Sequence, residues 1–221
     1  MNVEQVALVA SHGARSGLPL EVLAGLTLIG IAPFVLVMTT SFVRIVIVLS
    51  LVRSAIGASS LPPNTVLTGL ALVLTFVIMT PTLQQISHDA LEPYSRGALS
   101  QSALLARGFE PLRQFMLRQT HAKDLTLFAR MAHLPATIPV RTPPSVLLPA
   151  FVVGELRSAF AIGFALYLPF VAIDLAVASI LMGLGMFMLS PPIVSLPCKL
   201  LLFVMVDGWA LVCSGLISSF R

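Results

Sequence analysis

Charged residues are scarce in this chain. Only 10% of its 221 residues are Asp, Glu, Lys or Arg, whereas an ordinary soluble domain has about 25%. Hydrophobic residues make up 57% of the chain. Disorder is excluded because a disordered chain is poor in apolar residues, and a lone soluble domain is disfavoured because so few charges cannot cover its surface. Most of the chain is therefore expected to face lipid or other apolar protein.

Cysteines and catalytic motifs are equally sparse. The two cysteines, Cys198 and Cys213, would lie about 22 Å apart on one helix, too far for a disulfide bond within it. The sequence contains no CxxC pair, His/Cys cluster, P-loop, GxGxxG or convincing Ser/His/Asp arrangement, so it predicts no metal, no cofactor and no enzyme. The net charge is +4, but no basic stripe with interleaved aromatic residues predicts a nucleic-acid partner.

The charges that are present concentrate in the middle of the chain. Residues 85–141 hold seven of the thirteen basic residues and four of the nine acidic ones. This predicts apolar helices over 18–83, a polar amphipathic helical insert over 84–145 and an apolar helical hairpin over 146–221. Residues 1–17 lack the basic start and clean apolar core of a signal peptide, and an atypical signal is the alternative.

Long stretches with almost no charge predict an all-α fold of the integral-membrane type, with four spans. Each stretch is long enough to cross a hydrocarbon core of about 30 Å. Two prolines within these stretches affect the predicted helices: Pro81 is expected to end or kink its helix, and Pro169 makes one long straight helix unfavourable. The stretches are 18–38, 54–88, 158–198 and a last apolar helix over 196–220.

A few ionisable residues interrupt the apolar stretches. Facing lipid would be costly for each of them, so they are expected to be buried charges within the chain or between subunits. They are Arg44, Glu155, Arg157, Asp174, Lys199 and Asp207.

The partners of these charges depend on the hairpin. A turn centred near Met186 would bring Asp174 opposite Lys199, whereas a turn centred at Pro191 would bring Asp174 opposite Asp207. Glu155 and Arg157 are two residues apart and cannot face each other on a helix, so each needs a partner elsewhere, for which a neighbouring subunit is one candidate.

Four segments, in this order along the chain, resemble one family. They are TSFVRIVIVLSLVRSAIG (40–57), PLRQFMLR (111–118), ELRSAFAIGF (155–164) and LPCKLLLFV (196–204). The chain resembles the FliP/SctR family of export-gate proteins over roughly residues 18–220. The second segment is more similar to the flagellar members of the family than to those of injectisomes.

The resemblance implies a role and a set of partners. Family members form a ring of about five sister copies, a closed cyclic assembly, with a small two-helix gate subunit and a related single-copy gate subunit. Larger export-apparatus membrane proteins and membrane lipid surround this core, and unfolded protein substrates pass through it. The implied location is the bacterial inner membrane in the flagellar basal body, as a multi-pass protein with the polar insert on the periplasmic side.

Three methionines lie just before the Ser190–Pro192 turn. Met182, Met186 and Met188 stand in a stretch that also contains Gly183 and Gly185. Methionine is flexible and unbranched, so these residues are either soft packing or a ring of side chains that closes a pore. The resemblance implies that they form the pore gate. A secondary transporter is the competing function, but the inverted repeats and carboxylate series that would favour one are not visible.

Overall fold

The computed structural model describes residues 27, 30, 33–58, 61–134 and 142–220. All regular structure in these residues is helical, which confirms the predicted all-α class. The chain divides into two compact units, Met1–Val37 and Met38–Arg221. In the first unit, residues 33–37 are helical. Residues 1–17, for which a signal was considered, lie outside the described residues.

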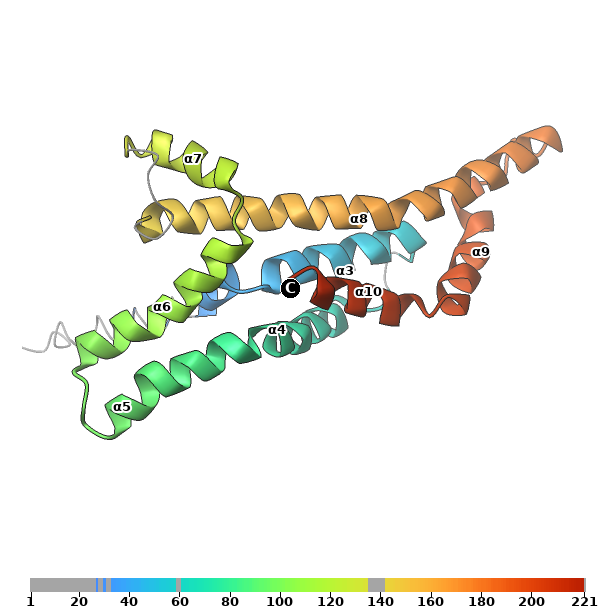
Figure 1. Cartoon of the computed structure of the whole chain (residues 1–221). Coiled ribbons are helices and arrows are strands. Elements are labelled where there is room, and N and C mark those ends of the chain that lie inside the picture. The colour runs from blue at the N-terminus through green and yellow to red at the C-terminus, as the bar shows by residue number, and fades with distance from the viewer. Residues whose placement is uncertain (1–26, 28–29, 31–32, 59–60, 135–141, 221) are drawn as a thin grey trace, which may run out of the picture. The chain divides into compact units, whose positions relative to one another are not determined.

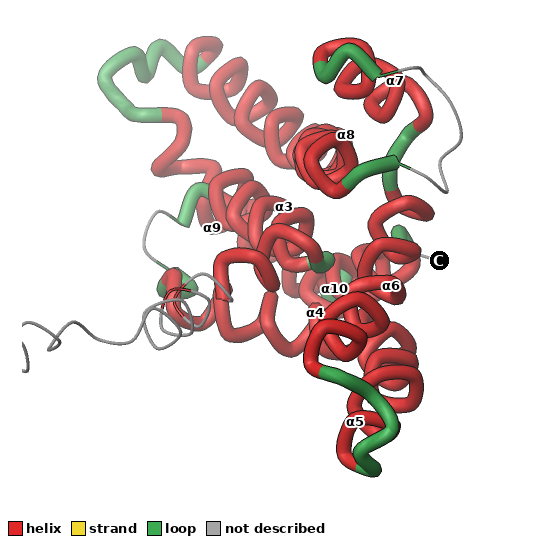
Figure 2. Tube along the Cα trace, turned by 90° about the vertical axis from the view of Figure 1, so that its left-hand side faces the viewer, coloured by secondary structure: helices red, strands yellow, loops and turns green. Residues whose placement is uncertain are grey.

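The second unit is a set of packed helices. Its central helix is α3, which lies between α8 and α4 and packs against both (Figures 1 and 2). Helices α6 and α7 also pack against α8. The elements are α3 (Phe42–Ile56), α4 (Asn64–Ile86), the π-helical turn η1 (Ser87–Leu91), α5 (Glu92–Ser95), α6 (Gln101–Gln119), α7 (Ala122–Met131), α8 (Pro144–Gly183), α9 (Pro191–Met205) and α10 (Gly208–Ser218).

The main core forms around α3 because that helix is apolar on nearly every side. Its residues Ile45, Val48 and Leu49 are fully buried, together with Ala71 of α4 and Ala159 of α8. Burying such side chains contributes roughly 1.5–3 kcal/mol each for the larger ones. The core therefore ties the apolar N-terminal helices to the long helix α8.

Two glycines fit α3 into this arrangement. Gly57 adopts φ +84° after the last turn, and its N–H donates to Ser54 O at 3.1 Å, the usual way in which a glycine ends a helix. Gly163 allows α8 to approach α3 closely, because an added Cβ there would overlap Leu51 Cδ1 and lie 3.1 Å from Leu51 Cβ.

The prolines do not end the helices that contain them. Helix α4 continues through Pro81 to Ile86, so of the two expected effects of Pro81, an end or a kink, the end is excluded. Helix α8 is continuous for 40 residues through Pro149 and Pro169, and it bends in its C-terminal part (Figure 1). A proline removes one backbone hydrogen bond and bends a helix, and in both helices the backbone stays helical on either side of the proline.

The expected single helix over 196–220 is also wrong. The structure has α9 and α10, which meet at an angle of 62°. Asp207 separates them with a left-handed φ of +50°. The backbone also continues as a helix across residues 83 and 84, where the polar insert was expected to begin. That boundary is a change in side-chain polarity rather than a break in the fold.

The described ranges contain two helices that could each cross a membrane, against the four spans expected. Asn64–Ser95 and Pro144–Gly183 are each long and apolar enough to cross a membrane, judged by length and composition. The number rises to four if two pairs of successive helices each count as one span. These pairs are Pro33–Thr39 with Phe42–Ile56, and Pro191–Met205 with Gly208–Ser218.

Candidate functional site

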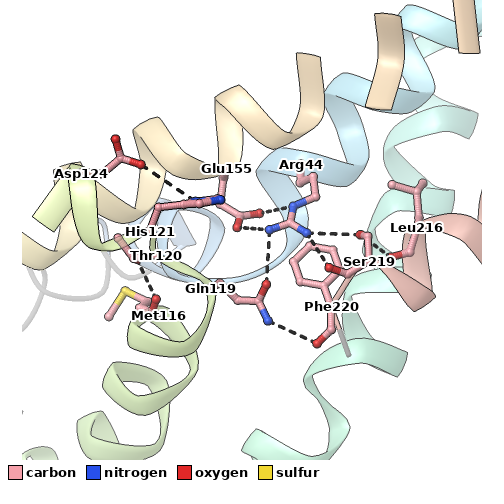
Figure 3. A network of polar contacts seen from close by, with 10 residues as sticks. All are labelled: Arg44, Met116, Gln119, Thr120, His121, Asp124, Glu155, Leu216, Ser219 and Phe220. Carbon is pink, nitrogen blue, oxygen red and sulfur yellow. Dashed lines mark hydrogen bonds and ion pairs between the residues drawn. The ribbon is translucent and has the colours of Figure 1, made fainter. Parts of the chain in front are cut away.

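The first buried charge pair joins α3 to α8. Arg44, in the first turn of α3, donates from Nε to Glu155 Oε2 at 2.8 Å and from Nη2 to Glu155 Oε1 at 2.5 Å (Figure 3). The two side chains are only 5% and 1% exposed. A carboxylate so far from water is tolerated because the guanidinium matches it with two parallel hydrogen bonds.

Arg44 also holds the end of the chain that follows α10. Its Nη1 donates to the carbonyl oxygen and Oγ of Ser219 at 3.0 and 3.2 Å, and its Nη2 donates to Gln119 Oε1 at 3.3 Å. Its Cζ lies 3.8 Å from the centre of the Phe220 ring, and Gln119 Nε2 donates to Phe220 O at 3.2 Å. We call Arg44, Gln119, Glu155, Ser219 and Phe220 the Arg44 cluster. It joins α3, α6, α8 and the segment after α10.

A second ion pair docks α7 on α8. Arg157 donates from Nη1 and Nη2 to the two carboxylate oxygens of Asp124, both at 2.7 Å. Asp124 is buried, whereas the Arg157 side chain remains 42% exposed. Glu155 and Arg157 therefore do have separate partners, as their spacing predicts, and both partners lie within this one chain.

A third pair closes the hairpin of α8 and α9. Lys199 Nζ donates to Asp174 Oδ2 at 2.6 Å and to Ala55 O at 3.3 Å. Ser195 Oγ donates to Asp174 Oδ1 at 2.5 Å. Of the two pairings left open by the sequence, the structure has Asp174 with Lys199. Asp207 lies exposed at the bend between α9 and α10, where its side chain does not cap α10.

The three methionines lie at or near the tip of this hairpin. Met182 is in the last turn of α8, and Met186 and Met188 are in the connection to α9. The chain leaves them 57%, 45% and 100% exposed. Gly185 makes the turn with φ +73°. The tip is therefore an exposed apolar surface, and the pair Asp174–Lys199 joins α8 to α9 below it.

Some residues of these clusters were missed by sequence reasoning. Ser195 had a local signal, because it lies one turn before Lys199 on the same face of α9. Gln119 and Phe220 had none, because their hydrogen bond joins residues 101 positions apart. Asp124 is one of several charges in a polar segment, and only the packing of α7 distinguishes it. Among the residues that the structure describes, no group of three or more His, Cys, Asp or Glu side chains could hold a metal ion.

Comparison with known proteins gives one consistent result. The model of the FliP family matches residues 25–216. The flagellar biosynthetic protein FliP of Pectobacterium carotovorum subsp. carotovorum is 50% identical over 204 residues, covering 92% of this chain and 79% of the relative. That of Bacillus subtilis (strain 168) is 46% identical over 196 residues, covering 88% and 89%. That of Caulobacter vibrioides is 46% identical over 225 residues, covering 98% and 83%.

Proposed function

This chain belongs to the FliP family, and we propose that it is a pore-forming subunit of the flagellar type III protein export gate. In this role it passes unfolded flagellar subunits across the bacterial inner membrane. A part in the flagellar export apparatus follows from the family, whereas formation of the pore is the finer proposal. The same role in an injectisome is the alternative, and the flagellar names of the relatives favour the flagellum.

The observation that carries the proposal is the methionine-bearing tip of the α8–α9 hairpin. Met186, Met188 and the neighbouring Phe187 are 45%, 100% and 79% exposed. Contiguous exposed apolar surface of this kind marks a site of contact with another molecule. In a ring of sister copies, the tips would meet on the axis. Flexible methionine side chains would close the opening to water and ions and part for a polypeptide.

The state of the buried charges supports assembly. Arg44 and Asp174 are each paired within the chain. Other subunits or lipid can therefore cover the apolar outer faces of the helices without leaving either of these charges buried and unpaired. Those faces are extensive, since Phe76, Phe164 and Leu201, on α4, α8 and α9, are each more than 60% exposed. We propose that sister copies (about five in a closed ring), the small two-helix gate subunit, the related single-copy gate subunit and lipid cover them.

The remaining features of the proposal concern location. The candidate spans support a membrane-embedded flagellar protein. We further propose that it resides in the inner membrane within the basal body, with the polar insert on the periplasmic side, in contact with larger export-apparatus membrane proteins. Its role is structural, without catalysis.

The pore is tested by replacing Met186 and Met188 together with Ala. Leakage of small ions across the inner membrane should rise in cells that carry the double variant, because the smaller side chains no longer fill the axis. Met131→Ala is the matched control, since Met131 is also well exposed (66%) but lies on α7. Unchanged leakage from a normally assembled double variant contradicts a methionine gate.

The assembly is tested separately on the detergent-purified complex. Its mass and a low-resolution image together report the number of copies and the axial symmetry. A ring with a central axis supports the proposal. A monomer that binds a small solute refutes it in favour of a secondary transporter.

A further inference from the structure

A polar pocket of about 330 Å³ opens beside the Arg44 cluster. Two arginines, Arg44 and Arg118, contribute to its wall, together with His121 and Ser158. The rest of the lining is the Gln119–Thr120 segment and Ser219. Every one of these side chains is polar and none is acidic, which makes the pocket rich in hydrogen-bond donors.

Several of the donors are already committed to the fold. All five N–H groups of the Arg44 guanidinium are accounted for by Glu155, Ser219 and Gln119. Thr120 Oγ1 donates to Met116 O at 2.7 Å, and the Ser219 hydroxyl donates to a carbonyl of α10 at 2.7 Å. These groups form the wall of the pocket and are not available to a ligand.

Three side chains remain available. Within the described part of the chain, neither Arg118 nor Ser158 makes a side-chain hydrogen bond or ion pair, and Arg118 is exposed. His121 Nδ1 forms a long ion pair with Asp124 Oδ2 at 4.0 Å, and its Nε2 makes no hydrogen bond within the described residues. The Arg118 guanidinium, His121 Nε2 and the Ser158 hydroxyl thus line one pocket without committed partners.

The charges around the pocket do not cancel. Arg44 is balanced by Glu155, and Asp124 is balanced by Arg157, in each case by a two-point ion pair. Arg118 has no such counterpart in the described ranges. The pocket therefore holds one uncompensated positive charge, and the ligand that complements it is an anion with several acceptor oxygens.

The pocket lies where apolar helices meet the polar insert. The apolar run of α3 follows directly after Arg44, and α8 carries one ionisable residue, Asp174, between Ser158 and Gly183. The C-terminal end of α10 reaches the same cluster through Ser219 (Figure 3). The junction of α6 and α7, from the polar insert, covers this level. Such a boundary is where lipid headgroups meet membrane helices.

We propose that this pocket binds the phosphate group of an anionic phospholipid. The phosphodiester charge balances Arg118, and its oxygens accept hydrogen bonds from Arg118, His121 and Ser158. Basic pockets between membrane helices bind anionic headgroups in this way. Inorganic phosphate has the same phosphate oxygens as the headgroup but lacks the acyl chains, which would pack against the apolar helices. The proposal does not depend on the methionine gate.

The experiment uses the detergent-purified complex. Phosphatidylglycerol, phosphatidylcholine or inorganic phosphate is added in separate arms, and native mass spectrometry measures the bound ligand. We expect retention of phosphatidylglycerol over the other two, because the positive choline of phosphatidylcholine cancels its phosphate charge and inorganic phosphate lacks acyl chains. Arg118→Gln should weaken phosphatidylglycerol binding about fivefold, the change that the loss of one such charge gives.

Two further variants make the result specific. Arg107→Gln removes a charge from an exposed position of the same helix, α6, away from the pocket, and should leave binding unchanged. Arg118→Lys keeps the charge and should keep most of the affinity. Thermal unfolding in phosphatidylcholine should be the same for wild type and Arg118→Gln, which separates loss of the ligand from loss of the fold.

Three outcomes overturn the proposal. They are equal binding of phosphatidylglycerol and phosphatidylcholine, retention of inorganic phosphate as strong as that of phosphatidylglycerol, and phosphatidylglycerol binding that Arg118→Gln leaves unchanged. Ion leakage through the gate is measured in a different assay, so failure of the lipid site and failure of the proposed function are distinguishable.

Discussion

Removing Glu155 should destabilise the protein far more than removing Glu155 and Arg44 together. Glu155 is 1% exposed at its side chain, and Arg44 is 5% exposed. In Glu155→Leu the guanidinium keeps its bonds to Ser219 and Gln119 but loses the carboxylate that neutralises it. The variant therefore leaves an uncompensated charge in the centre of the fold.

The size of the effect follows from the burial. Breaking a buried pair by removing one partner costs about 3–5 kcal/mol, whereas replacing both by apolar residues of similar volume is often nearly neutral. For a chain of this size, 1 kcal/mol shifts the melting temperature by about 2–4 °C. Glu155→Leu should thus lower it by about 6–20 °C. Arg44→Met with Glu155→Leu should recover more than half of that loss, with the remainder reflecting the lost contacts to Ser219 and Phe220.

The assay is thermal unfolding of the detergent-purified protein as a double-mutant cycle of Arg44→Met, Glu155→Leu and the pair. Strong coupling between the two positions is the expected result. The reasoning is refuted if the effects of the two single variants simply add, because then the ion pair observed between α3 and α8 does not neutralise a buried charge.

Two further predictions concern α8. Gly163→Ala should lower the melting temperature by about 2–12 °C, because its Cβ would overlap Leu51 Cδ1 and overpacking costs about 1–3 kcal/mol. The control is Gly69→Ala, where a Cβ meets nothing within 4 Å; it should be neutral or stabilising in thermal unfolding. Equal effects of the two substitutions on the melting temperature would contradict close packing at Gly163. Asp174→Lys should impair assembly of the complex, measured by size-exclusion chromatography. Adding Lys199→Asp should restore part of the assembly, because the 2.6 Å ion pair is rebuilt with reversed charges. A double variant that assembles no better than either single variant would contradict the pairing.

The helical class and the need to bury the ionisable residues were predictable from the sequence, and for one reason. Both depend on local composition: stretches such as 158–198 are too apolar and too uncharged for anything but buried or lipid-facing helices, and an ion such as Glu155 within one must be compensated wherever it lies. The spacing of Glu155 and Arg157 further showed that they cannot pair with each other.

Helix ends were less predictable where a residue has two permitted behaviours. A proline can end a helix or be carried within it, and Pro81 and Pro169 are carried within α4 and α8, with helical backbone on both sides of each. Asp207 shows the reverse: it stands in an otherwise apolar run where one continuous helix was expected, yet its left-handed backbone, followed by Gly208, divides α9 from α10.

The sequence by itself thus determined that this is an all-helical protein of the membrane type whose few internal charges need partners, and the resemblance of four segments indicated its family. Only the tertiary structure decided the partners: Arg44 with Glu155, 111 residues away, and Asp174 with Lys199 rather than Asp207. The physical reason is that a charge within an apolar stretch needs an opposite charge wherever it is buried, and the sequence around it shows this. Which residue provides the opposite charge depends on which helices lie side by side, and only the tertiary structure shows that.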